Sequence, residues 1–336
     1  MGAMRIVAAL AIGMGGAASA KDPKPLFQSA DVIQITFNGQ TAGASDKPRP
    51  GSIVIGNETL PITFTARGIT RRSKDICGFP PIRVMFTQPP PATSLFAKQS
   101  KLKLVTHCRS NADFQQYALL EYAAYRMYNR LTPVSFLTRL ASINYVGDNG
   151  KPIATRYGFF IEDTDDMAKR NGLAEPRTPD RVPISSLSPE PAARYAMFQH
   201  MIGNHDWSMR AGPAGEGCCH NGKLIGPVPG SNQYAPVPYD FDFSGMVGTP
   251  YAAPPAEMKI KNVKQRFYRG YCAHNAQAMK AAREMRAAQG DLLAILASTP
   301  GLDERNKARA SGYLAGFFAD IATDQLVQEK VLKGCT

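Results

Sequence analysis

Carboxylate and amide side chains gather in one stretch of the chain, from residue 203 to residue 245. They include, in order, Asn204, Asp206, Asn221, Asp240 and Asp242. Such side chains offer the hard oxygen ligands that Mg²⁺ prefers in proteins. An aspartate before a loop, an amide after it and a second aspartate further on can hold Mg²⁺ between phosphates and place a base beside a hydroxyl. The stretch therefore predicts a phosphoryl-transfer site.

The second acidic pair lies in residues 237–243, where apolar and acidic residues alternate. This alternation predicts a short strand that carries Asp240 and Asp242 on one side. Acidic residues framed by apolar segments are costly to keep as mere surface, because burial disfavours their charge. We therefore expect Asp206 and Asp240 to be functional.

The segments around this stretch predict the elements that must position it. Strands are expected from period-two patterns and turn residues at 32–37, 52–55, 60–66, 82–86, 102–105, 136–145 and 157–161. Helices are expected at 114–131, at 191–203 and, three or so in number, between 261 and 335. Strands with one helix, followed by a helical half, predict an α+β protein with two lobes.

The domain organisation follows from these elements. We expect a signal peptide at 1–20, an extended N-terminal arm with one early strand at 21–51, a strand-rich N-terminal lobe at 52–171 and a helical C-terminal lobe at 172–336. The candidate catalytic loop belongs to the helical lobe. A Pro- and Ser-rich linker or surface loop is expected at 172–190.

The first residues have the pattern of a secretory signal. Arg5 precedes a short apolar run, and Ala18-Ser19-Ala20 provides a small-residue cleavage pattern. We expect cleavage after Ala20 and an exported protein, periplasmic or secreted, with an uncleaved anchor as the alternative. No later segment is apolar over a length that would span a bilayer.

The charge balance is basic, with 39 Lys and Arg against 27 Asp and Glu and a net charge of +12. Such a surplus favours acidic partners such as phosphates or anionic envelope polymers. A solvated surface explains it better, because the basic residues are spread along the chain. Nucleic acid is not expected as a partner, since no basic stripe is interleaved with aromatic residues.

The cysteines are six, an even number, which in an exported chain indicates disulfides. Zinc at Cys218-Cys219-His220 is the rival interpretation, but adjacent cysteines rarely ligate one tetrahedral ion well. Cys77 and Cys108 flank neighbouring predicted strands and are expected to pair. The remaining expectation is that Cys218 and Cys219 bond to Cys272 and Cys335.

One tetrapeptide suggests a different enzyme. Residues 203–206, Gly-Asn-His-Asp, resemble the Gly-Asn-His-Asp/Glu element of the calcineurin-like metallophosphoesterases. The sequence lacks the Asp-x-His, Gly-Asp-x-x-Asp and Gly-His-x-His elements that complete that two-metal centre. A secreted metal-dependent phosphoesterase is therefore the second enzymatic hypothesis.

Four other segments, in this order and spacing, resemble the spore-coat CotH kinases of the atypical kinase-like superfamily. They are residues 67–71 (Arg-Gly-Ile-Thr-Arg), 156–163 (Arg-Tyr-Gly-Phe-Phe-Ile-Glu-Asp), 204–206 (Asn-His-Asp) and 238–242 (Pro-Tyr-Asp-Phe-Asp). The resemblance covers scattered pieces between residues 62 and 246. It implies a bilobal atypical kinase-like fold, ATP with Mg²⁺ or Mn²⁺ as cofactors, and phosphorylation of Ser or Thr in a protein.

The resemblance also implies roles for the residues of the 203–245 stretch. Asp206 would be the base or orienter of the acceptor hydroxyl, and Asp240 the main metal ligand with Asp242 beside it. Asn221 would be a second metal ligand. Asn204 is the alternative amide ligand, because fifteen residues separate Asp206 from Asn221.

Residues before that stretch would bind the nucleotide. Lys103, or else Lys101, would hold the phosphates, with Glu121 of the predicted helix as its partner. Arg67 would lie in a turn over the phosphates, and Glu162 ends the strand that leads into the inter-lobe hinge. The alternative function is a catalytically silent kinase-fold module that binds a partner or assists envelope assembly. The acceptor substrate stays open.

Overall fold

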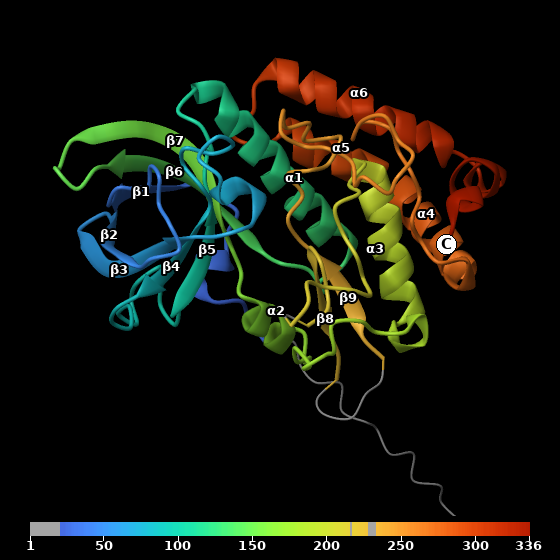
Figure 1. Ribbon diagram of the computed structural model, residues 1–336, viewed down its shortest axis with the longest axis horizontal. Helices are drawn as coiled ribbons and strands as arrows, with labels where there is room; N and C mark the ends of the chain where they lie inside the picture. Colours follow the sequence, from blue (N-terminus) through green and yellow to red (C-terminus); the bar gives the residue numbers. More distant parts are fainter. Residues whose placement is uncertain (1–20, 216, 228–232) are drawn as a thin grey trace, which may run out of the picture.

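The computed structural model describes residues 21–215, 217–227 and 233–336, so the predicted signal peptide lies outside the described residues. Within them, seven strands form a closed barrel in the order β1-β2-β3-β4-β5-β7-β6 (Figure 1). Its strands are β1 (Ile33–Asn38), β2 (Arg49–Ile55), β3 (Glu58–Ala66), β4 (Ile82–Phe86), β5 (Lys101–Val105), β6 (Thr138–Val146) and β7 (Pro152–Ile161). The barrel closes because β1 pairs antiparallel with β2 and parallel with β6.

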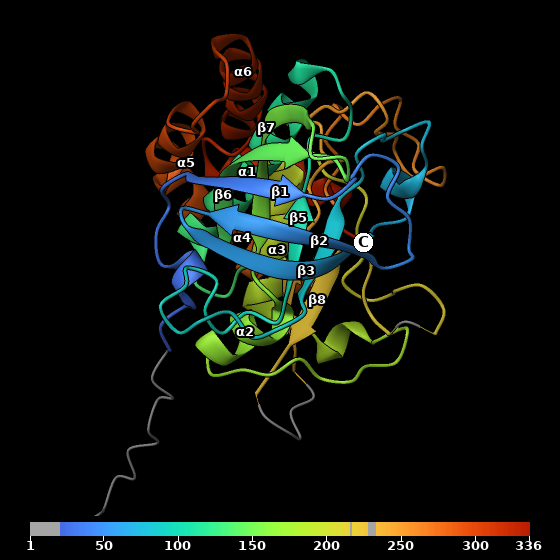
Figure 2. The same ribbon diagram turned by 90° about the vertical axis from the view of Figure 1, so that its left-hand side faces the viewer.

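The alternation of apolar residues places one face of each strand inside the barrel. In β3, Leu60, Ile62 and Phe64 are buried, and the residues between them are more exposed. They pack in a core with Phe37 and Phe160 from other strands. The predicted strands are all present, and the segment 21–51 supplies β1 and the start of β2 as part of the barrel (Figure 2).

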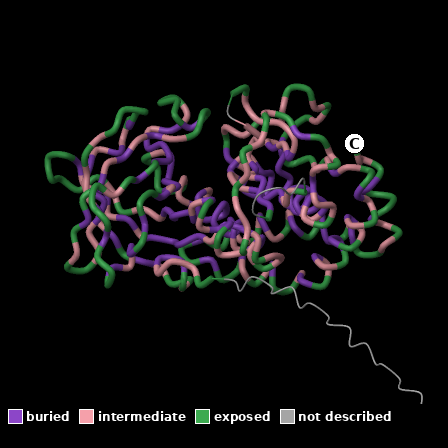
Figure 3. The backbone as a smooth tube through the Cα atoms, turned by 90° about the horizontal axis from the view of Figure 1, so that it is seen from below, coloured by how far each residue is buried: buried purple, intermediate pink, exposed green. Residues whose placement is uncertain are grey.

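The helices lie beside one end of the barrel (Figure 1). They are α1 (Gln115–Leu131), α2 (Thr164–Arg170), α3 (Pro189–Ile202), α4 (Asn275–Ala287), α5 (Gln289–Ala297), α6 (Glu304–Asp320) and the short α7 (Asp324–Leu326). Helix α1 contacts β6 and β7 on one side and α5 on the other. Buried residues of α1, α3 and the C-terminal helices form a second core, separate from that of the barrel (Figure 3).

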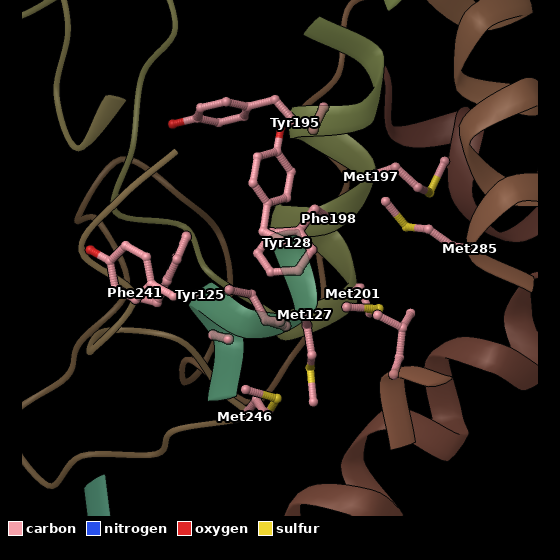
Figure 4. Packing of buried hydrophobic residues seen from close by; sticks show 14 of the residues in the cluster. Tyr125, Met127, Tyr128, Tyr195, Met197, Phe198, Met201, Phe241, Met246 and Met285 are labelled. Atoms are coloured by element: carbon pink, nitrogen blue, oxygen red, sulfur yellow. The ribbon is translucent and has the colours of Figure 1, made fainter. Parts of the chain in front are cut away.

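Aromatic rings join α1 and α3 to the segment after β9 (Ala235–Pro238). The ring centroids of Tyr128 and Phe198 lie 4.8 Å apart, and those of Tyr125 and Phe241 lie 4.7 Å apart (Figure 4). Phe198 also packs edge-on against Phe241. Such pairs add to the free energy gained from burial alone, so they fix the acidic residues on either side of Phe241 relative to both helices.

Helix α3 ends at Gly203 and releases the chain towards Asp206. Gly203 has a φ of 65°, and an added Cβ would collide with the hydroxyl of Tyr313. The Asn204 amide donates to the Gln199 carbonyl oxygen at 2.9 Å, which completes the helix end. The predicted helix at 191–203 is therefore correct apart from its start, which Ser188 and Pro189 move two residues earlier.

The predicted strand over residues 237–243 is wrong in its extent. Strand β9 ends at Pro238 and pairs antiparallel with β8 (Gly222–Ile225), a strand that the sequence did not predict. Asp240 adopts a φ of 64°, which is incompatible with a continuing strand. Its backbone amide instead donates to the hydroxyl of Tyr125 at 2.8 Å. Asp240 and Asp242 thus lie in a turn rather than on one face of a strand.

The disulfides confirm one predicted pairing and overturn the other. Cys77 is bonded to Cys108 as expected. Cys218 and Cys219 are bonded to each other, and Cys272 is bonded to Cys335. The prediction failed because the Cys272 amide is hydrogen-bonded to the carbonyl oxygen of Thr336, which brings the last residues to Cys272 and away from the loop that contains Cys218 and Cys219. None of the described helices has the length and hydropathy needed to cross a membrane.

The two disulfides outside the barrel should differ in what they contribute to stability. Cys272–Cys335 links residues 63 positions apart, whereas Cys218–Cys219 links neighbours. Replacing both Cys272 and Cys335 by Ser should lower the free energy of unfolding by about 2–4 kcal/mol, since a long loop loses its constraint. The matched Cys218→Ser/Cys219→Ser protein should lose much less. Urea unfolding measures both, and equal losses would contradict the assignment.

Candidate functional site

One buried guanidinium joins three carboxylates at the centre of the site. Arg71 is 7% exposed and lies in a short helical turn after β3. Its nitrogens lie 2.6 Å from Asp240, 3.2 Å from Asp242 and 3.4 Å from Glu121 of α1. The barrel, the first helix and the turn after β9 therefore meet at this residue.

The charges around Arg71 do not balance if all three carboxylates ionise. Burial raises the pKa of Glu121 to about 7, against the opposing effect of Arg71. Burial and the neighbouring charge of Asp240 also raise the pKa of Asp242. Burial acts in the same direction on Asp240, but Arg71 and Arg67 outweigh it and lower the pKa of Asp240. The contact with Arg71 thus favours the ionised form of Asp240, whereas the surroundings of Asp242 favour its protonated form.

Asp206 belongs to a second, separate group. His220 Nε2 lies 2.7 Å from Asp206 Oδ1, and the Asn221 amide nitrogen lies 3.0 Å from Oδ2 and 2.7 Å from the Asp206 carbonyl oxygen. Asn204 accepts a hydrogen bond from the Asp206 backbone amide at 3.1 Å. Both candidate amide ligands thus hold Asp206 in place, and only Asn221 also lines a cavity.

The two groups face one cavity of about 430 Å³. The turn after β3 lines it on one side, and the loops that carry Asp206 and Asp240 line it on the other. The polar residues around it are Asp46, Thr65, Arg67, Thr70, Arg71, Arg72, Arg83, Asp206, His220, Asn221, Tyr239, Asp240 and Asp242. Carboxylates and guanidinium groups together give this cavity the means to bind both a cation and an anion.

A second cavity of about 190 Å³ lies beside Lys103. It is lined by Arg83, Lys101, Leu102, Lys103, Asp163, Thr164, Asp165, Glu175 and Lys223. Arg83 lines both cavities. Together the two cavities extend from the end of β7 and the start of α2 to Asp206 and to Asp240.

Lys103 lies against aromatic rings rather than against a carboxylate. Its ammonium nitrogen lies 5.1 Å from the ring centre of Tyr239 and 5.6 Å from that of Phe136. Burial, followed by the charge of Arg67, lowers the pKa of Lys103 to about 7. An anion that entered the cavity would restore the charge of this amine, because its negative charge favours the protonated form.

The predicted contact of Glu121 with Lys103, or else with Lys101, is wrong. Glu121 pairs with Arg71 instead, because the turn after β3 inserts Arg71 over α1. Lys101 instead lies 3.4 Å from Asp163. Glu162 is buried. Its carboxylate lies 3.0 Å from the Arg170 guanidinium and accepts a hydrogen bond from the Leu137 backbone amide, so it does not face either cavity. Arg67 does line the larger cavity.

The oxygen ligands suit Mg²⁺ chemically, but Arg71 occupies them in this arrangement. Among the described residues, no group of three or more His, Cys, Asp or Glu side chains is placed to hold a metal ion. Asp240 and Asp242 each give an oxygen to the guanidinium. A metal ion would bind these aspartates only after Arg71 moves. The raised pKa of Asp242 indicates that more positive charge would be favourable at this site.

Sequence reasoning missed Arg71 and His220 as functional residues. Arg71 belongs to the 67–71 segment, but nothing in that pattern distinguishes a buried arginine from its exposed neighbour Arg72. His220 was considered only as a zinc ligand beside the cysteines. Its position next to Asn221 could have indicated its place, since Asn221 was already expected in the same site as Asp206.

Comparison with known proteins gives little more. No family model and no curated protein matches the chain. Among solved structures, the chain is similar to the Helicobacter pylori proinflammatory kinase CtkA, with a TM-score of 0.42 and 10% sequence identity, over 75% of this chain and 95% of that one. A similarity of this degree is too distant to assign a fold or an activity.

Replacing Arg71 should destabilise the protein in a pH-dependent way. In Arg71→Met the pKa values of the three buried carboxylates rise above those of the unfolded chain, so stability falls as pH rises through them. We expect a loss of about 3–5 kcal/mol at about pH 8 and a smaller loss at about pH 5. Chemical unfolding at both pH values checks this. Arg72→Met is the matched control, and a loss independent of pH would contradict the network.

Replacing Lys103 should have the opposite effect. The unfolded lysine has a pKa of 10.5 and the folded one about 7, so its charge penalty is complete below about pH 7 and fades as pH rises towards 10.5. Lys103→Met should raise the free energy of unfolding by about 1–2 kcal/mol at neutral pH, since water still reaches part of the ammonium. Lys151→Met on an exposed hairpin turn is the control. A gain that persisted at high pH would refute the lowered pKa.

Proposed function

We propose that this chain is an exported, bilobal kinase-like protein of the CotH type. It would transfer a phosphoryl group from ATP, with Mg²⁺ or Mn²⁺, to Ser or Thr of a protein. The barrel would be the N-terminal lobe and the helical half the C-terminal lobe.

A single observation carries this proposal. Lys103 of β5, Asp206 after α3 and Asp240 after β9 line two adjoining cavities, and Glu121 of α1 lies behind the larger one, in contact with Arg71. Their order along the chain is that of the phosphate-binding lysine, its helix glutamate, the catalytic loop and the metal-binding aspartate of kinases. Convergence of these residue types is hard to explain by packing alone, because buried charge is costly.

The nucleotide would extend across both cavities, with its phosphates between Lys103 and the turn after β3. Lys103 and Arg67 would counter the phosphate charge. Because the pKa of Lys103 is about 7 in the free protein, binding of the phosphates above this pH would draw a proton onto the amine.

Asp240 and Asp242 would hold the metal ion once Arg71 leaves them. The ion would neutralise phosphate charge and help to align the transferred group. The proton on Asp242 would leave when the ion binds, so we expect metal affinity to rise with pH. Export is supported by the three disulfides among the described cysteines, since such bonds persist mainly in oxidising compartments.

The Arg71 network favours one alternative, a catalytically silent kinase-fold module that binds a partner or assists envelope assembly. The guanidinium satisfies Asp240 and Asp242 without any metal. A protein that had lost its metal would need such an internal cation to keep its acidic residues buried. No observation favours the phosphoesterase hypothesis, because the described residues form no two-metal cluster.

Nucleotide binding tests the proposal directly. ATP with Mg²⁺ or Mn²⁺ should raise the melting temperature and show heat of binding by calorimetry. Asp240→Asn should abolish the metal-dependent part of that binding, since it removes a charge from the metal site at nearly constant volume. Asp291→Asn, on the exposed face of α5 beside Arg130, should bind as the unmodified protein does.

Transfer is measured separately, as incorporation of the γ-phosphoryl group into a protein acceptor or into the protein itself. If the unmodified protein shows neither nucleotide binding nor transfer with either metal, the kinase proposal is wrong as an activity, and the silent module takes its place.

A further inference from the structure

The carboxylate of Asp206 is already engaged on both oxygens. His220 Nε2 is bonded to Oδ1 at 2.7 Å, and the Asn221 amide is bonded to Oδ2 at 3.0 Å. Both partners come from the loop that returns from the Cys218–Cys219 disulfide. A substrate hydroxyl would have to displace or share one of these two partners in order to bond to the carboxylate.

The imidazole of His220 is open on its other side. Within the described residues no protein group is hydrogen-bonded to Nδ1 of His220. The side chain is 39% exposed, and it lines both the 430 Å³ cavity and the neighbouring surface hollow beside Trp207 and Arg269. A substrate hydroxyl that entered the cavity from this hollow would therefore meet the open nitrogen.

We propose that His220 is the general base for the acceptor hydroxyl, and that Asp206 is the residue that positions and charges it. This inference rests on the proposed function. The arrangement is that of a histidine held by a half-buried aspartate, with Nε2–H donating to the carboxylate and the Nδ1 lone pair facing the substrate. Asp206 then acts through His220 rather than on the substrate, which replaces the role that the sequence predicted for it.

The step balances as an ordinary phosphoryl transfer. The acceptor oxygen forms a bond to the γ-phosphorus of ATP while the bond from that phosphorus to the β,γ-bridging oxygen breaks. ADP leaves with the bonding electron pair, and the hydroxyl proton passes to Nδ1 of His220. The resulting imidazolium is stabilised by Asp206 until the proton is released to solvent.

The charges that face His220 set the pH dependence. The hydrogen bond to Asp206 raises the pKa of His220 above its usual value, and the negative charges of Asp206 and Asp240 raise it further. Burial and the positive charge of Arg269 act in the opposite direction and lower it. A base must be deprotonated to act, so the transfer rate should fall as pH drops through this raised pKa.

Two variants of His220 separate the roles. His220→Gln keeps a donor for Asp206 but has no basic nitrogen, and His220→Ala leaves space for free imidazole. If His220 is the base, Gln should lower the transfer rate by about 10²–10⁴-fold with unchanged ATP affinity. In the Ala variant, added imidazole should restore part of the rate, with a dependence on pH that follows the imidazole added.

Three readouts decide the outcome. A Gln variant that keeps the rate within about tenfold would show that His220 only orients Asp206, and the inference would be wrong. The same holds if the unmodified enzyme shows no acid limb near the pKa of a histidine, or if imidazole leaves the Ala variant unchanged. Failure of the proposed function looks different, because the unmodified protein would then show no ATP binding or no transfer.

Discussion

The buried contact between the Arg71 guanidinium and the carboxylates of Glu121, Asp240 and Asp242 is the interaction on which the arrangement of the site depends. It joins a turn of the barrel, a helix and a turn of the helical half. A buried charge of either sign is costly when it stands alone, so neither side of this contact is stable without the other. The relative position of the two hydrophobic cores is therefore set in part by electrostatics, whereas each core is held by apolar packing.

The acidic residues of the cavity thereby fall into two groups with different surroundings. Asp240 and Asp242 both contact Arg71, and burial and neighbouring charges shift the pKa of each. A change of charge nearby would therefore change which of them is protonated. Asp206 has an imidazole and an amide as partners, and within the described part of the chain it forms an ion pair with no basic side chain other than a protonated His220. The same residue type can thus serve charge compensation on one side of the cavity and proton movement on the other.

Much of the fold was predictable because it follows local periodicity. The barrel strands and α1 were found from the spacing of residues such as Leu60, Ile62 and Phe64. The alternation around Asp240 led to a wrong prediction of a strand. The Asp240 backbone amide donates a hydrogen bond to the hydroxyl of Tyr125, which is distant in sequence, and the chain turns there. Strand β8 is four residues long, too short for its pattern to be separated from a loop.

The gathering of Asp206, Asn221 and Asp240 was predicted from their order, but their partners were not. Which of several basic residues reaches Glu121 depends on how a turn of the barrel packs over α1, and no local pattern encodes that choice. Disulfide pairing had the same limit. Cys77–Cys108 joins segments whose proximity follows from predicted strands, whereas Cys272–Cys335 depends on where the last helices bring the chain.

The Cys218–Cys219 bond has a consequence for any work with this protein. It joins neighbours, so it fastens no distant parts of the chain together, yet it directly precedes His220 and Asn221. Its reduction would free the backbone beside these two residues and leave both hydrophobic cores intact. Protein that had lost this bond alone would then look folded by spectroscopy while differing in the loop that holds Asp206. Thiol content, rather than a melting curve, would reveal that loss.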